Sequence, residues 1–196
     1  MTRDDERRAR ANEAPIVGGL PDAPGIRVAM LLTPGLGVHL RGLADELLVH
    51  DYPGATIDRV DRELIATAVS AANDCFFCMD SHGAHAAAVM QATGRLNAMP
   101  AIEILKDEAD DGLDAKLAAL VRIARIVRRA PRELTVEDVE AATAAGASDG
   151  DVQLAVLIAA GFSMYNRMVD GFRAGTAPSI EAYAGRAAEI AAHGYS

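Results

Sequence analysis

Apolar residues recur at helical spacing along most of the chain from Ile26 onward, and no stretch shows the strict alternation of apolar and polar residues typical of a half-buried strand. Gly, Pro and helix-capping residues separate the periodic segments. The segments predicted to be helices are residues 36–50, 58–73, 75–93, 101–107, 113–127, 135–146, 151–172 and 180–193. The pattern therefore predicts one all-α domain over residues 26–196.

Residues that typically begin helices stand before four of these segments: Asn73-Asp74, Thr135, Ser148 and Pro178-Ser179. Asn73-Asp74 is predicted to cap the helix that begins at the two cysteines. Asp138 follows Thr135, and Asp151 follows Ser148, at the spacing of a capping box.

Residues 1–25 differ from the rest of the chain, because they combine charge with Gly and Pro, as in "VGGLPDAPG", and show no apolar period. Such a segment has too few apolar side chains to offset the backbone entropy that ordering costs, about 1–2 kcal/mol per residue. We therefore predict an N-terminal arm that is flexible by itself. We expect a neighbouring subunit of a homo-oligomer to hold it.

The composition favours helices packed closely against one another. Hydrophobic residues make up 51% of the 196 residues, but aromatic residues only 4%, and there is no tryptophan. The apolar content is therefore mostly alanine, leucine, isoleucine and valine, which suits helix-on-helix packing. A chain of this length forms one sizeable core, so we expect a single domain behind the arm.

The formal net charge of −9 argues against a nucleic-acid partner, because phosphate backbones are bound by clustered lysine and arginine. The first residues, "MTRDDERRARANEA", lack the apolar run of a secretory signal, and no uninterrupted apolar stretch reaches membrane-spanning length. We therefore expect a cytoplasmic protein without a membrane partner. In a reducing compartment, two cysteines favour a catalytic, redox or metal-binding role, with a structural disulfide as the alternative.

Candidate chemistry is concentrated in "DCFFCMDSHGAH", residues 74–85, which contains both cysteines and two of the five histidines. Counted at 100° per residue, Cys75, Cys78, His82 and His85 fall within about 80° of one helical face. His82 stands four residues after Cys78, so a base lies beside that sulfur. A helix N-terminus and an imidazole both favour the thiolate, which is the reactive form. Cys78 is thus the predicted attacking thiolate, and Cys75, one turn earlier, the resolving thiol.

Two other interpretations of the cluster stay open. A structural zinc ion would need ligands from elsewhere, such as His39 or His50, because one helical stripe cannot surround an ion tetrahedrally. The cysteines could also be ordinary buried small side chains. His85 lies beyond the reach of either sulfur, so we interpret it as structural, and His39, His50 and His193 show no recognisable partner.

The chain contains the pattern E-x11-C-x2-C-x3-H, which is formed by Glu63, Cys75, Cys78 and His82. This pattern resembles the signature of the AhpD-like alkylhydroperoxidases in the carboxymuconolactone decarboxylase superfamily. The surrounding "DRELIATAVSAANDCFFCMDSHGAHA" is similar to the core of that family. The later "LTVEDVEAATAAGASDGDVQLAVLIAAGFSMYNRM" resembles the C-terminal half of its peroxidase-related branch, and the resemblance spans residues 27–185.

The resemblance implies an AhpD-like all-α fold whose subunits assemble as dimers, trimers or hexamers. It implies that Cys78 reacts with a small hydroperoxide and that Cys75 resolves the product. It also implies a proton relay in which Glu63 assists Cys75 and His82 bridges to Cys78. Without the resemblance, Glu63 is an ordinary helix acid. The reductant it implies is a thiol, such as a dihydrolipoyl protein, and no metal or other cofactor is expected.

One position departs from the pattern of some family members, which carry a histidine directly before the second cysteine, where this chain has Phe77. The missing titrating group leaves the level of peroxidase activity open. We predict a thiol-dependent peroxidase. The alternatives are a decarboxylase of the superfamily, against which the Cys-x-x-Cys pair argues, and a non-enzymatic redox sensor or structural protein.

Overall fold

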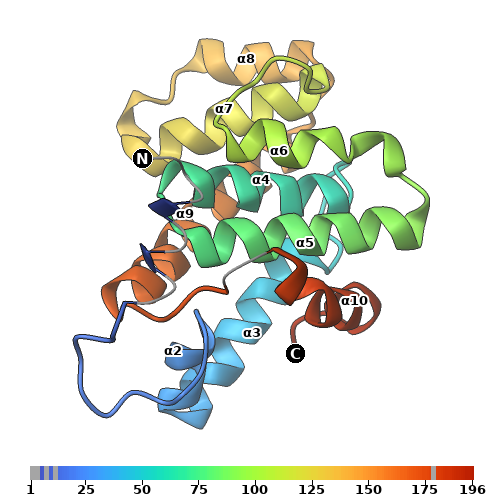
Figure 1. The fold of residues 1–196 in the computed structure, drawn as a ribbon. Coiled ribbons are helices and arrows are strands. Elements are labelled where there is room, and N and C mark those ends of the chain that lie inside the picture. Colours follow the sequence, from blue (N-terminus) through green and yellow to red (C-terminus); the bar gives the residue numbers. More distant parts are fainter. Residues whose placement is uncertain (1–4, 7–8, 11–12, 178–179) are drawn as a thin grey trace.

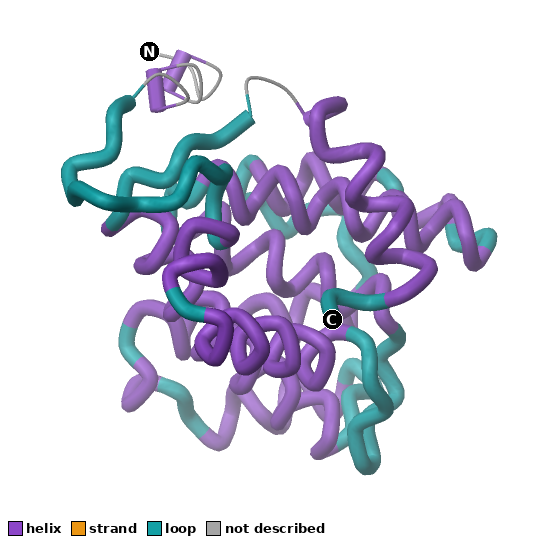
Figure 2. Tube along the Cα trace, turned by 90° about the horizontal axis from the view of Figure 1, so that it is seen from below, coloured by secondary structure: helices purple, strands orange, loops and turns teal. Residues whose placement is uncertain are grey.

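The computed structural model describes residues 5–6, 9–10, 13–177 and 180–196, and in this part of the chain the only regular elements are helices (Figures 1 and 2). The α-helices are α2 (Arg27–Leu32), α3 (Pro34–Leu48), α4 (Arg59–Ala72), α5 (Phe76–Thr93), α6 (Pro100–Lys106), α7 (Ala115–Arg129), α8 (Val136–Ala144), α9 (Asp149–Gly171) and α10 (Ala184–His193). Short 3-10 helices cover Leu96–Ala98, Pro131–Glu133 and Ile180–Tyr183. The predicted all-α fold is confirmed, while the helix start predicted at Pro178-Ser179 lies outside the described residues.

Helix α4 lies at the centre of the fold and packs against α5, α6, α7 and α9 (Figure 1). Its neighbours surround it, so Leu64, Ile65 and Val69 are fully buried. Glu63 and Thr67 of the same helix are also fully buried. A carboxylate at this depth is tolerated only where other groups hydrogen-bond it or balance its charge, so Glu63 marks a polar site inside the core.

Helix α9 is long and apolar enough to cross a membrane by length and composition alone. In the fold it packs against α4 and α7, and Leu154, Ile158 and Phe162 belong to the main core. Its apolar character is therefore that of a core helix. Both predicted capping boxes are confirmed, at Thr135 of α8 and at Ser148 of α9.

The turn between α4 and α5 differs from the sequence prediction. Asn73 ends α4 as its C-cap, and Asp74 adopts a left-handed conformation with φ of 55°. The N-cap of α5 is Cys75, without a side-chain cap. The predicted N-cap at Asn73-Asp74 is therefore wrong. Asn and Asp tolerate both turn and cap conformations, and here they serve the turn, which is closed by the bond from Cys75 N to Ser70 O at 3.0 Å.

The chain after α10 turns back toward the core at Gly194, whose φ of 85° favours glycine. A Cβ atom there would lie 2.8 Å from Asp45 Oδ1. Asp45 of α3 instead accepts a hydrogen bond from the backbone N–H of Tyr195 at 2.6 Å. This turn places the Tyr195 side chain beside α4 and α5.

The described part of residues 1–25 contacts this chain near the start of α5. Arg10 donates a hydrogen bond to the carbonyl of Asp74 at 2.9 Å, and Gly25 N donates to Gly175 O at 3.1 Å. Gly25 has a φ of 56°, and a Cβ atom there would meet the Phe77 ring at 2.2 Å. The close approach of this segment to Phe77 therefore requires glycine. Contact of the arm with a neighbouring subunit stays a prediction.

Candidate active site

Both cysteines lie at the start of α5 and are buried. Cys75 is fully buried as the N-cap residue, and Cys78 is 2% exposed in the first turn. Both are free thiols, and they share a small apolar cluster with Val28, Val169 and Ala174. The first turn carries backbone N–H groups without intrahelical acceptors and the positive end of the helix dipole, so it favours a thiolate at Cys78.

Cys75 interacts with Cys78 and with Asp170 of α9. The contact with Cys78, followed by burial and by the Asp170 carboxylate, raises the pKa of Cys75 well above its ordinary value. Cys75 is therefore a protonated thiol near neutral pH.

His82 stands one turn after Cys78 and faces Glu63 of α4, with 2.7 Å between His82 Nδ1 and Glu63 Oε2. Burial alone would raise the pKa of Glu63, but the hydrogen bond and charge of His82 hold it below its ordinary value. Glu63 is thus a carboxylate that accepts the Nδ1 proton of His82. Because Nδ1 faces the Glu63 carboxylate, Nε2 is the ring nitrogen left to exchange a proton with another group.

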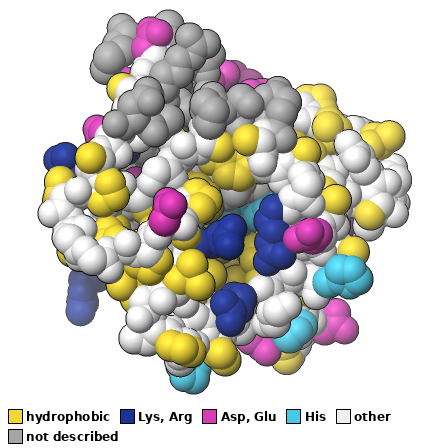
Figure 3. Space-filling model, turned by 60° about the horizontal axis from the view of Figure 1, so that its bottom comes forward, with side chains coloured by type: hydrophobic (Ala, Val, Ile, Leu, Met, Phe, Trp, Pro, Cys, Tyr) yellow, Lys and Arg dark blue, Asp and Glu magenta, His cyan; other side chains and the backbone are white. Residues whose placement is uncertain are grey.

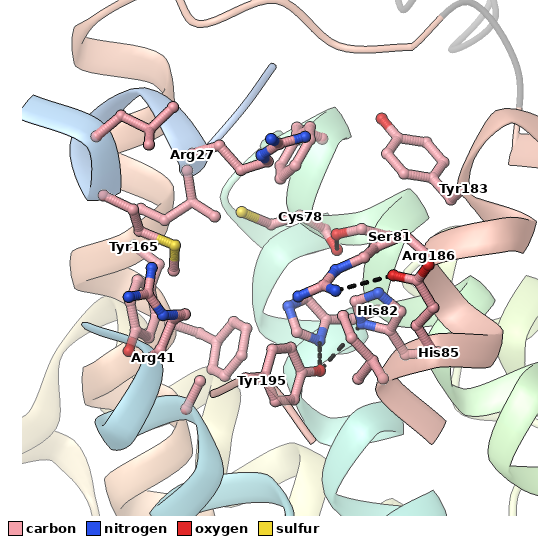
Figure 4. Close-up of a pocket in the computed structure, with 18 residues that line it drawn as sticks. Arg27, Arg41, Cys78, Ser81, His82, His85, Tyr165, Tyr183, Arg186 and Tyr195 are labelled. Carbon is pink, nitrogen blue, oxygen red and sulfur yellow. Dashed lines mark hydrogen bonds and ion pairs between the residues drawn. The ribbon is translucent and has the colours of Figure 1, made fainter. Parts of the chain in front are cut away.

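Tyr195 completes the hydrogen-bonded cluster around Glu63. Its hydroxyl donates to Glu63 Oε1 at 2.7 Å. The same hydroxyl lies 3.0 Å from His85 Nδ1 and 3.3 Å from His82 Nδ1 (Figure 4). Burial lowers the pKa of His85 to about 3, so His85 is neutral at pH 7. Its Nδ1–H can therefore donate to the Tyr195 oxygen, and every polar atom facing the carboxylate has a partner.

A cavity of about 460 Å³ opens beside Cys78 and His82. Its apolar lining includes Phe77, Phe162 and Tyr183. The His82 ring packs edge-on against Phe162, with centroids 4.5 Å apart. Figure 3 shows the hollow, with Lys and Arg side chains around it and a histidine visible inside. The size and lining suit a small organic molecule.

The structure brings the four predicted site residues, Glu63, Cys75, Cys78 and His82, to the region where α4 and α5 meet. Both oxygens of Glu63 are engaged by His82 and Tyr195, whereas the carboxylate that interacts with Cys75 belongs to Asp170. The assistance of Cys75 by Glu63 stays a prediction.

Sequence reasoning missed Tyr195 and Asp170. Tyr195 lies 132 residues from Glu63 along the chain, and no spacing rule links positions that only tertiary packing brings together. Asp170 lies on α9, and its sequence neighbours give no sign of a nearby thiol. His85, interpreted as structural, borders the cavity and contacts Tyr195.

The histidines considered as outside zinc ligands do not join the cluster. His50 pairs with Glu46 at 3.0 Å, and His39 is exposed on α3. A different set, Glu63, His82 and His85, has ligand atoms within 4.8 Å of one another and could approach a metal ion. In this structure both Glu63 oxygens accept hydrogen bonds, from His82 and Tyr195.

Comparison with known proteins agrees with this geometry. The model of the carboxymuconolactone decarboxylase family matches residues 44–104, which include all four predicted site residues. No curated protein matches the chain.

Two crystal structures of bacterial proteins resemble the fold. The first is an alkylhydroperoxidase AhpD core, an uncharacterized peroxidase-related protein from Ralstonia eutropha JMP134, with a TM-score of 0.68, 23% identity, and coverage of 82% of this chain and 80% of that chain. The second is an uncharacterized peroxidase-related protein from Silicibacter sp. TM1040, with a TM-score of 0.67, 25% identity, and coverage of 89% and 94%. The predicted AhpD-like helical fold is confirmed.

Proposed function

We propose that this chain, an AhpD-like member of the carboxymuconolactone decarboxylase superfamily, is a thiol-dependent peroxidase that reduces small hydroperoxides. The observation that carries the proposal is the position of Cys78. It borders the cavity, contacts the protonated thiol of Cys75, and stands one turn before His82, which Glu63 orients. A nucleophile, a resolving thiol and a positioned base are the groups that a dithiol peroxidase requires.

In the first step, the Cys78 thiolate attacks the terminal oxygen of a hydroperoxide ROOH. The S–O bond forms as the O–O bond breaks, so Cys78 becomes a sulfenic acid and RO⁻ leaves. His82 Nε2 first takes the Cys78 thiol proton and then returns it to RO⁻, which leaves as the alcohol ROH. Glu63 keeps the proton on Nδ1 and stabilises the imidazolium that forms between the two transfers.

In the second step, the Cys75 sulfur attacks the sulfur of the Cys78 sulfenic acid. The S–S bond forms and the S–O bond breaks, and the hydroxide that leaves takes the Cys75 thiol proton and departs as water. Asp170 interacts with the Cys75 thiol, so its carboxylate can accept that proton during the attack and pass it to the leaving hydroxide. The disulfide then stores the two electrons that the peroxide removed.

In the third step, a dithiol reductant returns the enzyme to its starting state by thiol–disulfide exchange. One reductant thiolate attacks the disulfide to form a mixed disulfide, and the second reductant sulfur displaces the protein thiol. Two electrons and two protons restore both cysteines, so the cycle converts ROOH and a dithiol into ROH, water and a disulfide. A dihydrolipoyl group is a dithiol of the required kind.

We also propose that the protein acts as a cytoplasmic homo-oligomer, a dimer, trimer or hexamer. Supporting this, large apolar side chains are exposed on α2 and α3, among them Leu31, Leu32, Leu36, Val38 and Leu43. Monomeric proteins seldom expose many large apolar side chains on adjoining helices, and an interface between copies would cover them.

The test is steady-state consumption of cumene hydroperoxide with dihydrolipoamide as the electron donor. We expect many turnovers per subunit and their loss in Cys78→Ser. A protein that oxidises once and then stops is a redox sensor or a structural disulfide protein, and that result would overturn the proposed activity.

A further inference from the structure

Three arginines line the cavity beside Cys78, and each comes from a different helix: Arg27 from α2, Arg41 from α3 and Arg186 from α10. In Figure 4 they lie around the cavity, with Cys78 and His82 among them. The chain as a whole carries a formal charge of −9, so this gathering of cations is opposite in sign to the protein. Such local positive charge marks a place where an anion is attracted.

The charges of Arg27 and Arg41 are not balanced within the part of the chain that the structure describes. No carboxylate there forms an ion pair with either guanidinium. Arg41 is half-buried, and Arg27 is exposed at the cavity. Arg186, in contrast, pairs with Glu189 at 3.0 Å, and Glu189 also lines the cavity. Arg27 and Arg41 therefore remain available to a ligand.

The rest of the lining is apolar and includes Ile26, Met30, Phe77, Phe162 and Ile190. A ligand that satisfies both features has a hydrophobic body and one anionic group. A guanidinium binds a carboxylate through two parallel hydrogen bonds, and a partly desolvated site strengthens this interaction.

We propose that the cavity binds an organic hydroperoxide that carries a carboxylate, with the carboxylate on Arg27 and Arg41, the hydrocarbon body against the apolar lining, and the peroxide at Cys78. The inference rests on the proposed function for the reacting group, but the anion site can be tested independently of catalysis. The proposed substrates are therefore amphipathic organic acids that have been oxidised to hydroperoxides.

The first test measures binding alone, by calorimetry on the reduced protein. The probes are 4-isopropylbenzoate and the neutral 4-isopropylbenzamide, which share a hydrocarbon body. Because a hydrogen bond to a charged group contributes more than a neutral one, we expect the carboxylate to bind about tenfold tighter or more. Equal affinities for the two probes would overturn the proposal.

The second test locates the site with matched variants. Arg27→Gln and Arg41→Gln should each reduce the preference for the carboxylate, and the Lys variants should retain part of it. Arg129→Gln is the control, because Arg129 is an exposed residue of α7 paired with Glu133. Gln variants that keep the full preference, with a circular dichroism spectrum like that of the starting protein, would overturn the assignment to these arginines.

The third test compares kcat/KM for cumene hydroperoxide and for its 4-carboxylate. We expect a preference for the carboxylate that falls about tenfold in the Arg27→Gln/Arg41→Gln double variant. Turnover of both peroxides at equal rates leaves the peroxidase intact and overturns the anion site. Tight binding of 4-isopropylbenzoate without turnover of either peroxide supports the anion site and overturns the proposed activity.

Discussion

The hydroxyl of Tyr195 donates a hydrogen bond to Glu63 Oε1 at 2.7 Å, while His82 Nδ1 bonds the other carboxylate oxygen, Oε2, at 2.7 Å. Tyr195 reaches this position because Gly194 allows a left-handed turn and Asp45 binds the Tyr195 backbone. We infer that Tyr195 is a positioning residue, since it acts on His82 through the Glu63 carboxylate. A change at Tyr195 should therefore alter both stability and the reactivity of Cys78.

Tyr195→Phe retains the packed ring and removes only the hydroxyl. Glu63 then loses one of the two hydrogen bonds that satisfy its buried carboxylate, so the free energy of unfolding should fall by about 1–3 kcal/mol. Urea denaturation at pH 7 measures the change. Tyr52→Phe is the matched control, because the Tyr52 hydroxyl bonds Gln153 at an exposed site. Equal losses in the two variants would show that Tyr195 contributes nothing specific to Glu63.

The roles of the two cysteines predict different products from two serine variants. Cys78→Ser should not consume peroxide, whereas Cys75→Ser should oxidise once and retain a sulfenic acid on Cys78, since no resolving thiol remains. Labelling with dimedone followed by mass spectrometry detects the sulfenic acid. A label on Cys75 in the Cys78→Ser protein, with none on Cys78 in the other, means that the roles are inverted.

His82→Gln keeps a polar side chain beside Cys78 but removes the proton acceptor. Peroxide consumption should fall by about 10²-fold or more, the usual contribution of a positioned base. Alkylation of the reduced protein by iodoacetamide at pH 7 should slow as well. His50→Gln removes an exposed histidine paired with Glu46 and should change neither rate. If iodoacetamide alkylates His82→Gln as fast as it alkylates His50→Gln and the starting protein, His82 is a structural residue.

The buried neutral His85 predicts that acid destabilises the fold. An unfolded histidine binds a proton below about pH 6.5, whereas the pKa of folded His85 is lowered by burial to about 3. The unfolded state therefore binds more protons in this interval, and the free energy of unfolding decreases by about 1.4 kcal/mol per pH unit as pH falls. The lowered pKa of Glu63 adds to the loss at still lower pH.

Urea denaturation at several pH values between about 6.5 and 4 measures this slope. His85→Gln cannot bind the proton in either state, so its slope should be smaller. His50→Gln, at an exposed position, should keep the slope of the starting protein. A His85→Gln protein with an unchanged slope contradicts the assignment of the acid sensitivity to His85.

The N-terminal arm predicts a concentration-dependent assembly. Light scattering should show a full-length oligomer at micromolar concentration, and deletion of residues 1–25 should weaken the association or lower the melting temperature. In the Cys75→Ser background, dimedone labelling of Cys78 should persist after the deletion, because Cys78 lies outside the deleted segment. A full-length monomer rules out the oligomer, and an equally stable truncated assembly rules out a role for the arm.

The local sequence was sufficient to predict elements whose causes are local. Capping boxes at Thr135 and Ser148 depend on residues three positions apart, so both were found. The helix that carries Cys78 and His82 was also predicted from local periodicity, although Cys75 precedes its first turn as the N-cap. Glu63 required the family resemblance, because nothing local distinguishes a buried helix acid from an exposed one.

The remaining features depend on contacts between distant segments. The turn at Asp74 is fixed by backbone bonds from α4, such as Cys75 N to Ser70 O, and these overrule the capping preference of Asn73 and Asp74. Tyr195 and the arginines Arg27 and Arg41 reach the site from opposite ends of the chain. Only the packing of α2, α3 and α10 around α5 and α9 brings them together.

The burial of the two sulfur atoms has a kinetic consequence. Cys78 borders the cavity, while Cys75 is fully buried and does not line it. Peroxide and reductant must therefore both approach Cys78, one after the other, through the same space. This order corresponds to a ping-pong scheme, with parallel lines in double-reciprocal plots at low concentrations of both reactants. At high concentration, each reactant should inhibit competitively against the other.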